Sequence, residues 1–146
     1  MPFETPNIDL VGNITASVHE HGGVAPTTII RTDTSWAVNI NWSLLGTNWQ
    51  MIGGTWHVHV NLESMGPGPE LSLVDFADPA CMNAPLPSVD GQYFCHFDVP
   101  AGVATAAHQG TAYKLVVLLT YRNLLGQPGP IAAYYEGPIL QFYNAS

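Results

Sequence analysis

The chain has 146 residues, of which 11 are Asp or Glu and only three are Lys or Arg, so its formal net charge is −8 at pH 7. Nucleic acids and anionic membranes attract proteins through clustered Lys and Arg. Three scattered cations exclude such a cluster, so we expect neither a nucleic acid nor a membrane as a partner.

Hydrophobic residues make up 47% of the sequence, which is unlike the composition of disordered proteins. Fourteen glycines and 12 prolines interrupt it at short intervals, and runs of alternating apolar and polar residues lie between them. Side chains of a β-strand point alternately to its two faces, so each run predicts a half-buried strand. In chain order, we predict strands at residues 8–18, 35–44, 55–63, 71–73, 93–99, 113–122 and 131–143.

The connections contain the residues that break regular structure. Residues 77–90 include three prolines, and we predict a long irregular loop there. The last strand should bend at Gly137-Pro138, because proline cannot donate a hydrogen bond to a ladder. Seven strands separated by turn residues predict an all-β fold, a seven-stranded antiparallel sandwich. The sandwich would occupy residues 7–143 of one domain that spans residues 1–146.

The segment Gly110-Thr111-Ala112-Tyr113-Lys114-Leu115 looks like the tyrosine corner that opens strand F of immunoglobulin-like domains. Trp56 stands where strand C of such domains often buries a tryptophan. The chain therefore resembles the immunoglobulin and fibronectin type III superfamily over residues 7–143, as a pattern of strands. It departs from antibody domains because the second and sixth strands carry no cysteine. The resemblance implies an immunoglobulin-like sandwich and no particular function.

The two cysteines, Cys81 and Cys95, leave their redox state open. Paired, they would close a loop of about 15 residues, worth roughly 3 kcal/mol in the chain-entropy model. The first residues lack the basic and apolar stretches of a secretion signal, so we expect a cytoplasmic chain as encoded, where free thiols are the rule. Cys95 shares the inward side of its strand with Tyr93 and Phe97, which favours a buried, unreactive cysteine over a catalytic thiolate.

Four histidines, His19, His21, His57 and His59, form two His-x-His pairs. Residues i and i+2 of a strand point the same way, about 7 Å apart, so one pair could bind one metal ion. Four imidazoles together would suit zinc or copper. The strands that carry the two pairs usually belong to opposite sheets of such a sandwich. We therefore expect no cofactor and keep a Zn²⁺ or Cu²⁺ site as the alternative.

Motifs of catalysis are weakly represented. The sequence has no G-x-S-x-G elbow and no phosphate-binding glycine loop before a helix. Cys95 and His96 are adjacent and point to opposite faces of a strand, so they cannot pair with each other. Asp75 and Asp78 are predicted to lie in a solvated turn rather than at a Ca²⁺ site. These observations favour a chain that is not an enzyme.

The strand at 113–122 carries apolar residues on both sides. With Tyr113, Leu115 and Val117 inward, Val116 and Leu118 point outward, where a solvated face should be polar. In the topology of the resembled family, their neighbours on strands C and G would be His57, His59, Ala132 and Tyr134. An exposed apolar patch of this kind indicates an interaction site. The alternative is that the loop at 77–90 or the N-terminal arm covers this face.

These residues lead to three hypotheses. The first is a binding or self-assembly module, a homo-oligomer or part of a larger protein assembly, that associates through the outer face of strands C, F and G. The second is a metal-binding protein or metalloenzyme that uses the His-x-His pairs. The third is a small-molecule site lined by aromatic side chains, namely Trp36, Trp42, Trp49, Tyr134 and Tyr135.

Overall fold

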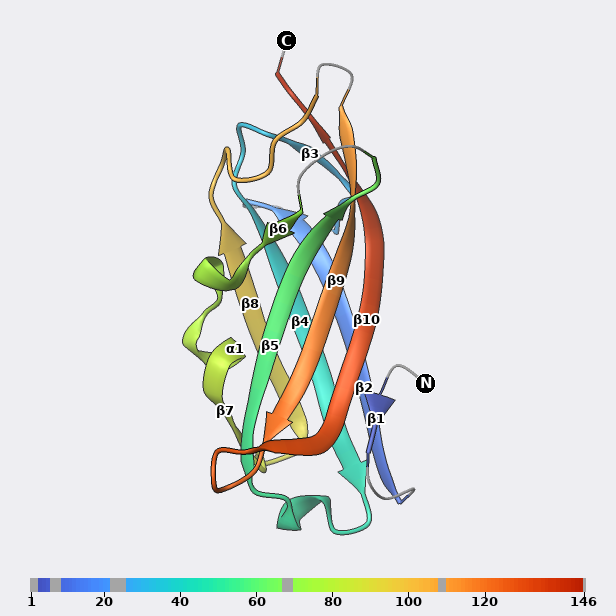
Figure 1. The fold of residues 1–146 in the computed structure, drawn as a ribbon, viewed down its shortest axis with the longest axis vertical. Helices are drawn as coiled ribbons and strands as arrows, with labels where there is room; N and C mark the ends of the chain where they lie inside the picture. The colour runs from blue at the N-terminus through green and yellow to red at the C-terminus, as the bar shows by residue number, and fades with distance from the viewer. Residues whose placement is uncertain (1–2, 6–8, 22–25, 67–69, 108–109, 146) are drawn as a thin grey trace.

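The computed structural model describes residues 3–5, 9–21, 26–66, 70–107 and 110–145, and it consists of two β-sheets packed face to face (Figure 1). The smaller sheet has the order β2-β4-β8 and contains β2 (Leu10–Glu20), β4 (Trp36–Gly46) and β8 (Gln92–Val99). The larger sheet has the order β1-β10-β9-β5-β6 and contains β1 (Phe3–Glu4), β10 (Pro128–Tyr143), β9 (Thr111–Arg122), β5 (Gly54–Ser64) and β6 (Leu71–Ser72). Two further strands of the larger sheet are β3 (Ile29–Arg31), beside β10, and β7 (Ala84–Leu86), beside β5.

The seven strands predicted from alternation are β2, β4, β5, β6, β8, β9 and β10, so the all-β sandwich is confirmed. The first, second and fifth of them form one sheet and the other four form the second, which is an immunoglobulin-like arrangement. The strand count was too low, because β1, β3 and β7 have two or three residues each and show no periodicity. The sandwich is also not wholly antiparallel, because β3 pairs with β10 in parallel.

The tyrosine corner is present at the start of β9. The Tyr113 side chain is fully buried, and its hydroxyl donates a hydrogen bond of 2.8 Å to the Thr105 carbonyl oxygen. Trp56 is fully buried on β5 and packs edge-on against Trp42 of the opposite sheet and against Tyr121. The contact between Trp56 and Trp42 joins the two sheets across the core, and both residues that carried the resemblance are thus confirmed.

The segment after β6 is more regular than predicted. It contains two 3₁₀ or α-helical turns, η2 (Val74–Phe76) and α1 (Pro79–Asn83), before β7. Asp78 begins α1, because its Oδ1 accepts a 2.6 Å hydrogen bond from the Ala80 amide, and Pro79 suits the first turn, where no donor is needed. Helix α1 contacts both β5 and β8, so it closes one lateral side of the sandwich rather than covering an outer face (Figure 1).

Strand β10 is continuous, but its register against β9 shifts between Glu136 and Ile139. The predicted bend at Gly137-Pro138 is thus a β-bulge, which moves the following side chains to the other face of the sheet. Ile131 and Ala133 are buried before the bulge, whereas Leu140 and Phe142 are buried after it. Within the described residues, no helix is long and apolar enough to cross a membrane.

Candidate functional site

The outer face of β5, β9 and β10 presents the predicted patch. Cross-strand pairing places Leu118 of β9 between His59 of β5 and Tyr134 of β10. The next row toward the centre of the strands has Val116 between Asn61 and Glu136. The two flanking rows are His57, Thr120 and Ala132 on one side and Glu63, Lys114 and Ile139 on the other. We call these twelve residues the outer face.

Three large apolar side chains of the outer face are accessible to solvent. Leu118 is 41%, Tyr134 44% and Ile139 53% exposed. Val116 points outward as predicted, since it lies between the fully buried Leu115 and Val117 and is absent from the core cluster, yet it is only 8% exposed. The apolar centre that a partner can touch is therefore Leu118 and Tyr134, with Ile139 beyond them.

A polar network lies beside Val116 on the outer face. Lys114 Nζ lies 2.7 Å from Glu136 Oε2, and the Tyr134 hydroxyl donates a 2.8 Å hydrogen bond to Glu136 Oε1. Glu136 of β10 is paired directly across from Val116 of β9, and Lys114 lies two residues before Val116 on the same face of β9. Hydrogen bonding to Glu136 raises the pKa values of Lys114 and Tyr134, and hydrogen bonding to Lys114 and Tyr134 lowers that of Glu136. This exposed network fixes the orientation of the Tyr134 ring.

His57 and His59 border the apolar centre on β5, as predicted, and both are half-buried. Burial lowers the pKa of His57, and the positive charges of Arg122 and His59 lower it further. His57 is therefore mostly neutral at pH 7. The described parts of the two segments proposed as a cover do not lie over the face: β7 pairs with the edge of β5, α1 contacts β5 and β7, and β1 pairs with the edge of β10.

The four histidines do not converge. His19 is on β2 of the smaller sheet and His21 follows the end of that strand, whereas His57 and His59 point outward from the larger sheet. The Ser17 hydroxyl lies 3.0 Å from His19 Nε2. The structure therefore does not bring the two pairs together at one shared zinc or copper site. Across the described ranges, no three His, Cys, Asp or Glu side chains are grouped to hold a metal ion.

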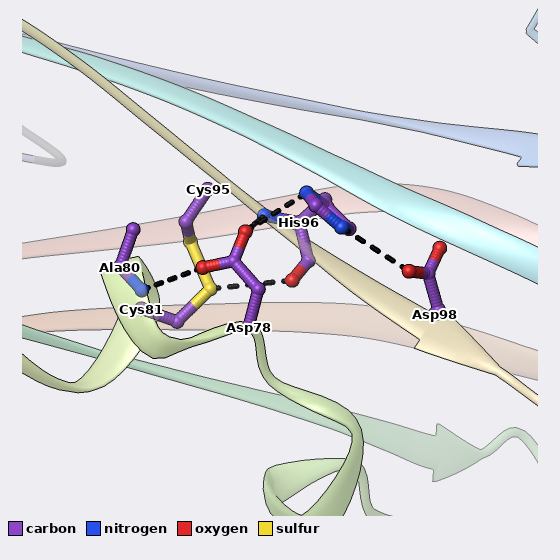
Figure 2. A network of polar contacts seen from close by, with 6 residues as sticks. All are labelled: Asp78, Ala80, Cys81, Cys95, His96 and Asp98. Atoms are coloured by element: carbon purple, nitrogen blue, oxygen red, sulfur yellow. Dashed lines mark hydrogen bonds and ion pairs between the residues drawn. A yellow bond between two sulfur atoms is a disulfide. The ribbon is translucent and has the colours of Figure 1, made fainter.

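Cys81 and Cys95 form a disulfide, which corrects the preference for free thiols (Figure 2). Beside it, His96 Nδ1 lies 2.8 Å from Asp78 Oδ2, and His96 Nε2 lies 3.1 Å from Asp98 Oδ2. Asp78 also accepts a hydrogen bond from the His96 amide, so it is part of a junction between α1 and β8 and not of a solvated turn. Both imidazole nitrogens have carboxylate partners, and both sulfur atoms are bonded to each other. This cluster fastens α1 to β8.

Comparisons with known proteins add little to these observations. No protein-family model matches the chain, and no curated protein matches it. One solved structure is similar, the crystal structure of AggA, the major subunit of aggregative adherence fimbriae type I from Escherichia coli. The alignment covers 97% of this chain and 99% of AggA, with 14% sequence identity and a TM-score of 0.38. We report this similarity without extending the function of AggA to this chain.

The aromatic residues proposed to line a small-molecule site do not surround one cavity. Trp36 and Trp42 are buried in the core, where Trp36 packs against Phe142 and Trp42 stacks on Tyr93. Tyr134 faces solvent on the outer face, so it cannot share a pocket with these indoles. The remaining two, Trp49 and Tyr135, pack partly buried against the core.

Sequence reasoning placed Ile139 of the outer face on the wrong side of its strand. A strict alternation along residues 131–143 places Ile139 on the same side as Ile131, in the core. The bulge at Gly137-Pro138 reverses this and brings Ile139 opposite Lys114. The dipeptide itself was the available signal, because a glycine followed by a proline inside a strand indicates such an irregularity.

Proposed function

We propose that this chain is a non-enzymatic binding module whose copies associate through the outer face of β5, β9 and β10. The observation that supports the proposal is the contiguity of Leu118 and Tyr134, which are paired across strands at the centre of the face and remain accessible. The polar side chains of His59, Asn61 and Glu136 surround this centre. An apolar centre with a polar rim is the usual anatomy of a protein interface.

The size of the face indicates the strength of association. Strands are spaced about 4.8 Å apart and outward residues about 6.8 Å apart along a strand, so three strands with four outward residues each cover roughly 400 Å². Stable interfaces bury about 800 Å² per partner. We therefore expect weak, concentration-dependent self-association, in which complete burial of Leu118 contributes on the order of 2 kcal/mol before the entropic cost of association.

Sedimentation velocity over a range of concentrations tests this proposal. The wild-type chain should show a species larger than the monomer at high micromolar concentration, and Leu118→Asp should shift the chain to monomer. Phe94→Asp is the matched control, because Phe94 is similarly exposed on β8 of the opposite sheet. Equal melting temperatures would show that both variants are folded.

A wild-type chain that stays monomeric at the highest soluble concentration contradicts the proposal. A loss of association that Phe94→Asp shares with Leu118→Asp also contradicts it, because the interface would then not be specific to the outer face.

A further inference from the structure

The four most exposed large apolar side chains of the described residues lie at one end of the sandwich. They are Met51, Val89, Leu124 and Leu125, between 79% and 103% exposed. The connections that carry them join β4 to β5, β7 to β8 and β9 to β10, at the end where β4 and β9 finish (Figure 1). Single exposed apolar side chains are ordinary on protein surfaces, but a group this exposed indicates a contact with an apolar phase or partner.

The connection after β4 lies against each of the other two connections, so the three form one surface. A Cβ at Gly53 would lie 3.1 Å from a Leu124 methyl group, so the connection between β9 and β10 packs on the connection between β4 and β5. A Cβ at Gly91 would lie 3.3 Å from the Trp49 ring, and the Gly91 carbonyl accepts a hydrogen bond from the Leu44 amide. We call the surface formed by residues 47–53, 87–91 and 123–127 the apolar loop end.

The turn after β9 holds its two leucines largely exposed, although the Leu124 side chain lies beside Gly53. Asn123 Oδ1 accepts hydrogen bonds from the amides of Leu125 and Gln127, at 2.9 and 3.1 Å. The Asn123 amide donates to the Gln127 carbonyl, and Gly126 supplies the positive φ of 77° that the turn requires. The backbone therefore fixes Leu124 and Leu125 at the tip, so they do not fold back onto the core.

The charge of the apolar loop end distinguishes between lipid surfaces. Within its three segments Asp90 is the only charged residue, and none is Lys or Arg. Arg122 borders this surface, and its Nη1 donates a 3.1 Å hydrogen bond to the Gly126 carbonyl oxygen. Asp90 and this one cation together leave no net positive charge to attract anionic lipid headgroups. Trp49 belongs to the same surface but is partly buried against the core, unlike the four exposed apolar side chains. Tryptophan is favoured at the level of lipid headgroups because its ring is apolar and its N–H is polar.

We propose that the apolar loop end inserts shallowly into an electrically neutral phospholipid bilayer. The side chains project from three convex turns, and a deformable acyl phase accepts such projections without a matching concave partner. The expectation of no membrane partner came from net charge, which bears on ionic attraction and not on apolar insertion. The proposal is independent of self-association, because the outer face lies on the side of the sandwich and the loops lie at its end (Figure 1).

Flotation of the full chain with phosphatidylcholine vesicles tests the insertion. Wild type should float with these vesicles to the same extent at low and high salt, and Leu124→Asn combined with Leu125→Asn should reduce the partition coefficient on the order of tenfold or more. Met51→Gln should reduce it as well. Met65→Gln is the matched control, because Met65 is also exposed but lies after β5, at the opposite end.

Tryptophan fluorescence provides a second readout. Three of the four tryptophans are buried in the core and Trp49 is the partly exposed one, so vesicles should shift the emission to shorter wavelength in wild type and not in the double leucine variant. The absence of flotation by wild type overturns the proposal, and so does equal flotation of wild type and the leucine variant. Binding that requires phosphatidylserine and is abolished by salt overturns it as well. A leucine variant that changes oligomeric state but floats like wild type would assign this end to a second copy instead.

Discussion

Replacing both Cys81 and Cys95 with alanine should lower the free energy of unfolding by about 3 kcal/mol. The two residues are 14 positions apart, and in the chain-entropy model a closed loop of about 15 residues restricts the unfolded chain by roughly 3 kcal/mol. On the native side the substitution spares the Asp78 contacts, so α1 should keep its hydrogen bond to Ala80 and its ion pair with His96. The two sulfur atoms are buried, and the small cavity they leave adds to the loss.

Urea unfolding followed by tryptophan fluorescence measures this difference. Wild type without reductant should unfold at a higher midpoint than wild type with reductant, and the double alanine variant should behave alike under both conditions. The slope with denaturant should also be smaller for the oxidised wild type, since a crosslinked unfolded chain exposes less surface. If wild type has the same midpoint with and without reductant, while the thiols are shown by mass spectrometry to have changed state, the assigned role of the disulfide is wrong.

Two further changes test the corner of β9 and the titration at the outer face. Tyr113→Phe should cost about 1 kcal/mol, because it removes the hydrogen bond to the Thr105 carbonyl while keeping the buried ring; thermal unfolding measures it, and an unchanged melting temperature would contradict the tyrosine-corner role. The pKa of His57 is lower in the folded state than its ordinary value of 6.5. As the pH falls below 6.5, the unfolded state therefore binds the proton at a higher pH than the folded state does. Its contribution to stability is therefore complete above 6.5 and is lost as the pH falls through the folded-state pKa, so His57→Asn should lose less stability than wild type between about pH 7 and pH 5 in parallel urea titrations.

Alternation was sufficient to predict the long strands and the sides of most of their residues. It placed Trp56 in the core and Leu118 on the outer face, because a period of two leaves little choice once one side is buried. The tyrosine corner was predictable from Gly110 and Tyr113, since the motif is local. Strands of two or three residues were not predictable, because β3 pairs with β10 across more than half the chain and leaves no local signal.

Three errors had different physical causes. Val116 faces outward as predicted, but it is only 8% exposed, and it lies beside the Lys114–Glu136 pair, which forms only once β10 is in register with β9. Ile139 was missed because the bulge changes parity. The disulfide was judged from the expected compartment, whereas its formation depends on α1 bringing Cys81 to β8, with 5.3 Å between the two Cα atoms. Each of these facts belongs to tertiary structure and not to a window of sequence.

The edge of β10 is covered at its two ends by the short strands β1 and β3, which come from the first 31 residues, while β10 spans Pro128–Tyr143. During synthesis these two segments cannot pair with β10 until residues 132–143 have left the ribosome. Bringing β1 and β3 to β10 closes a loop of about 100 residues or more, and this loop closure costs chain entropy before the pairing contributes any stability. The N-terminal segments should therefore be among the last parts to become protected, and a nascent chain that stalls before residue 128 would expose β9 as an unpaired edge open to pairing with other chains.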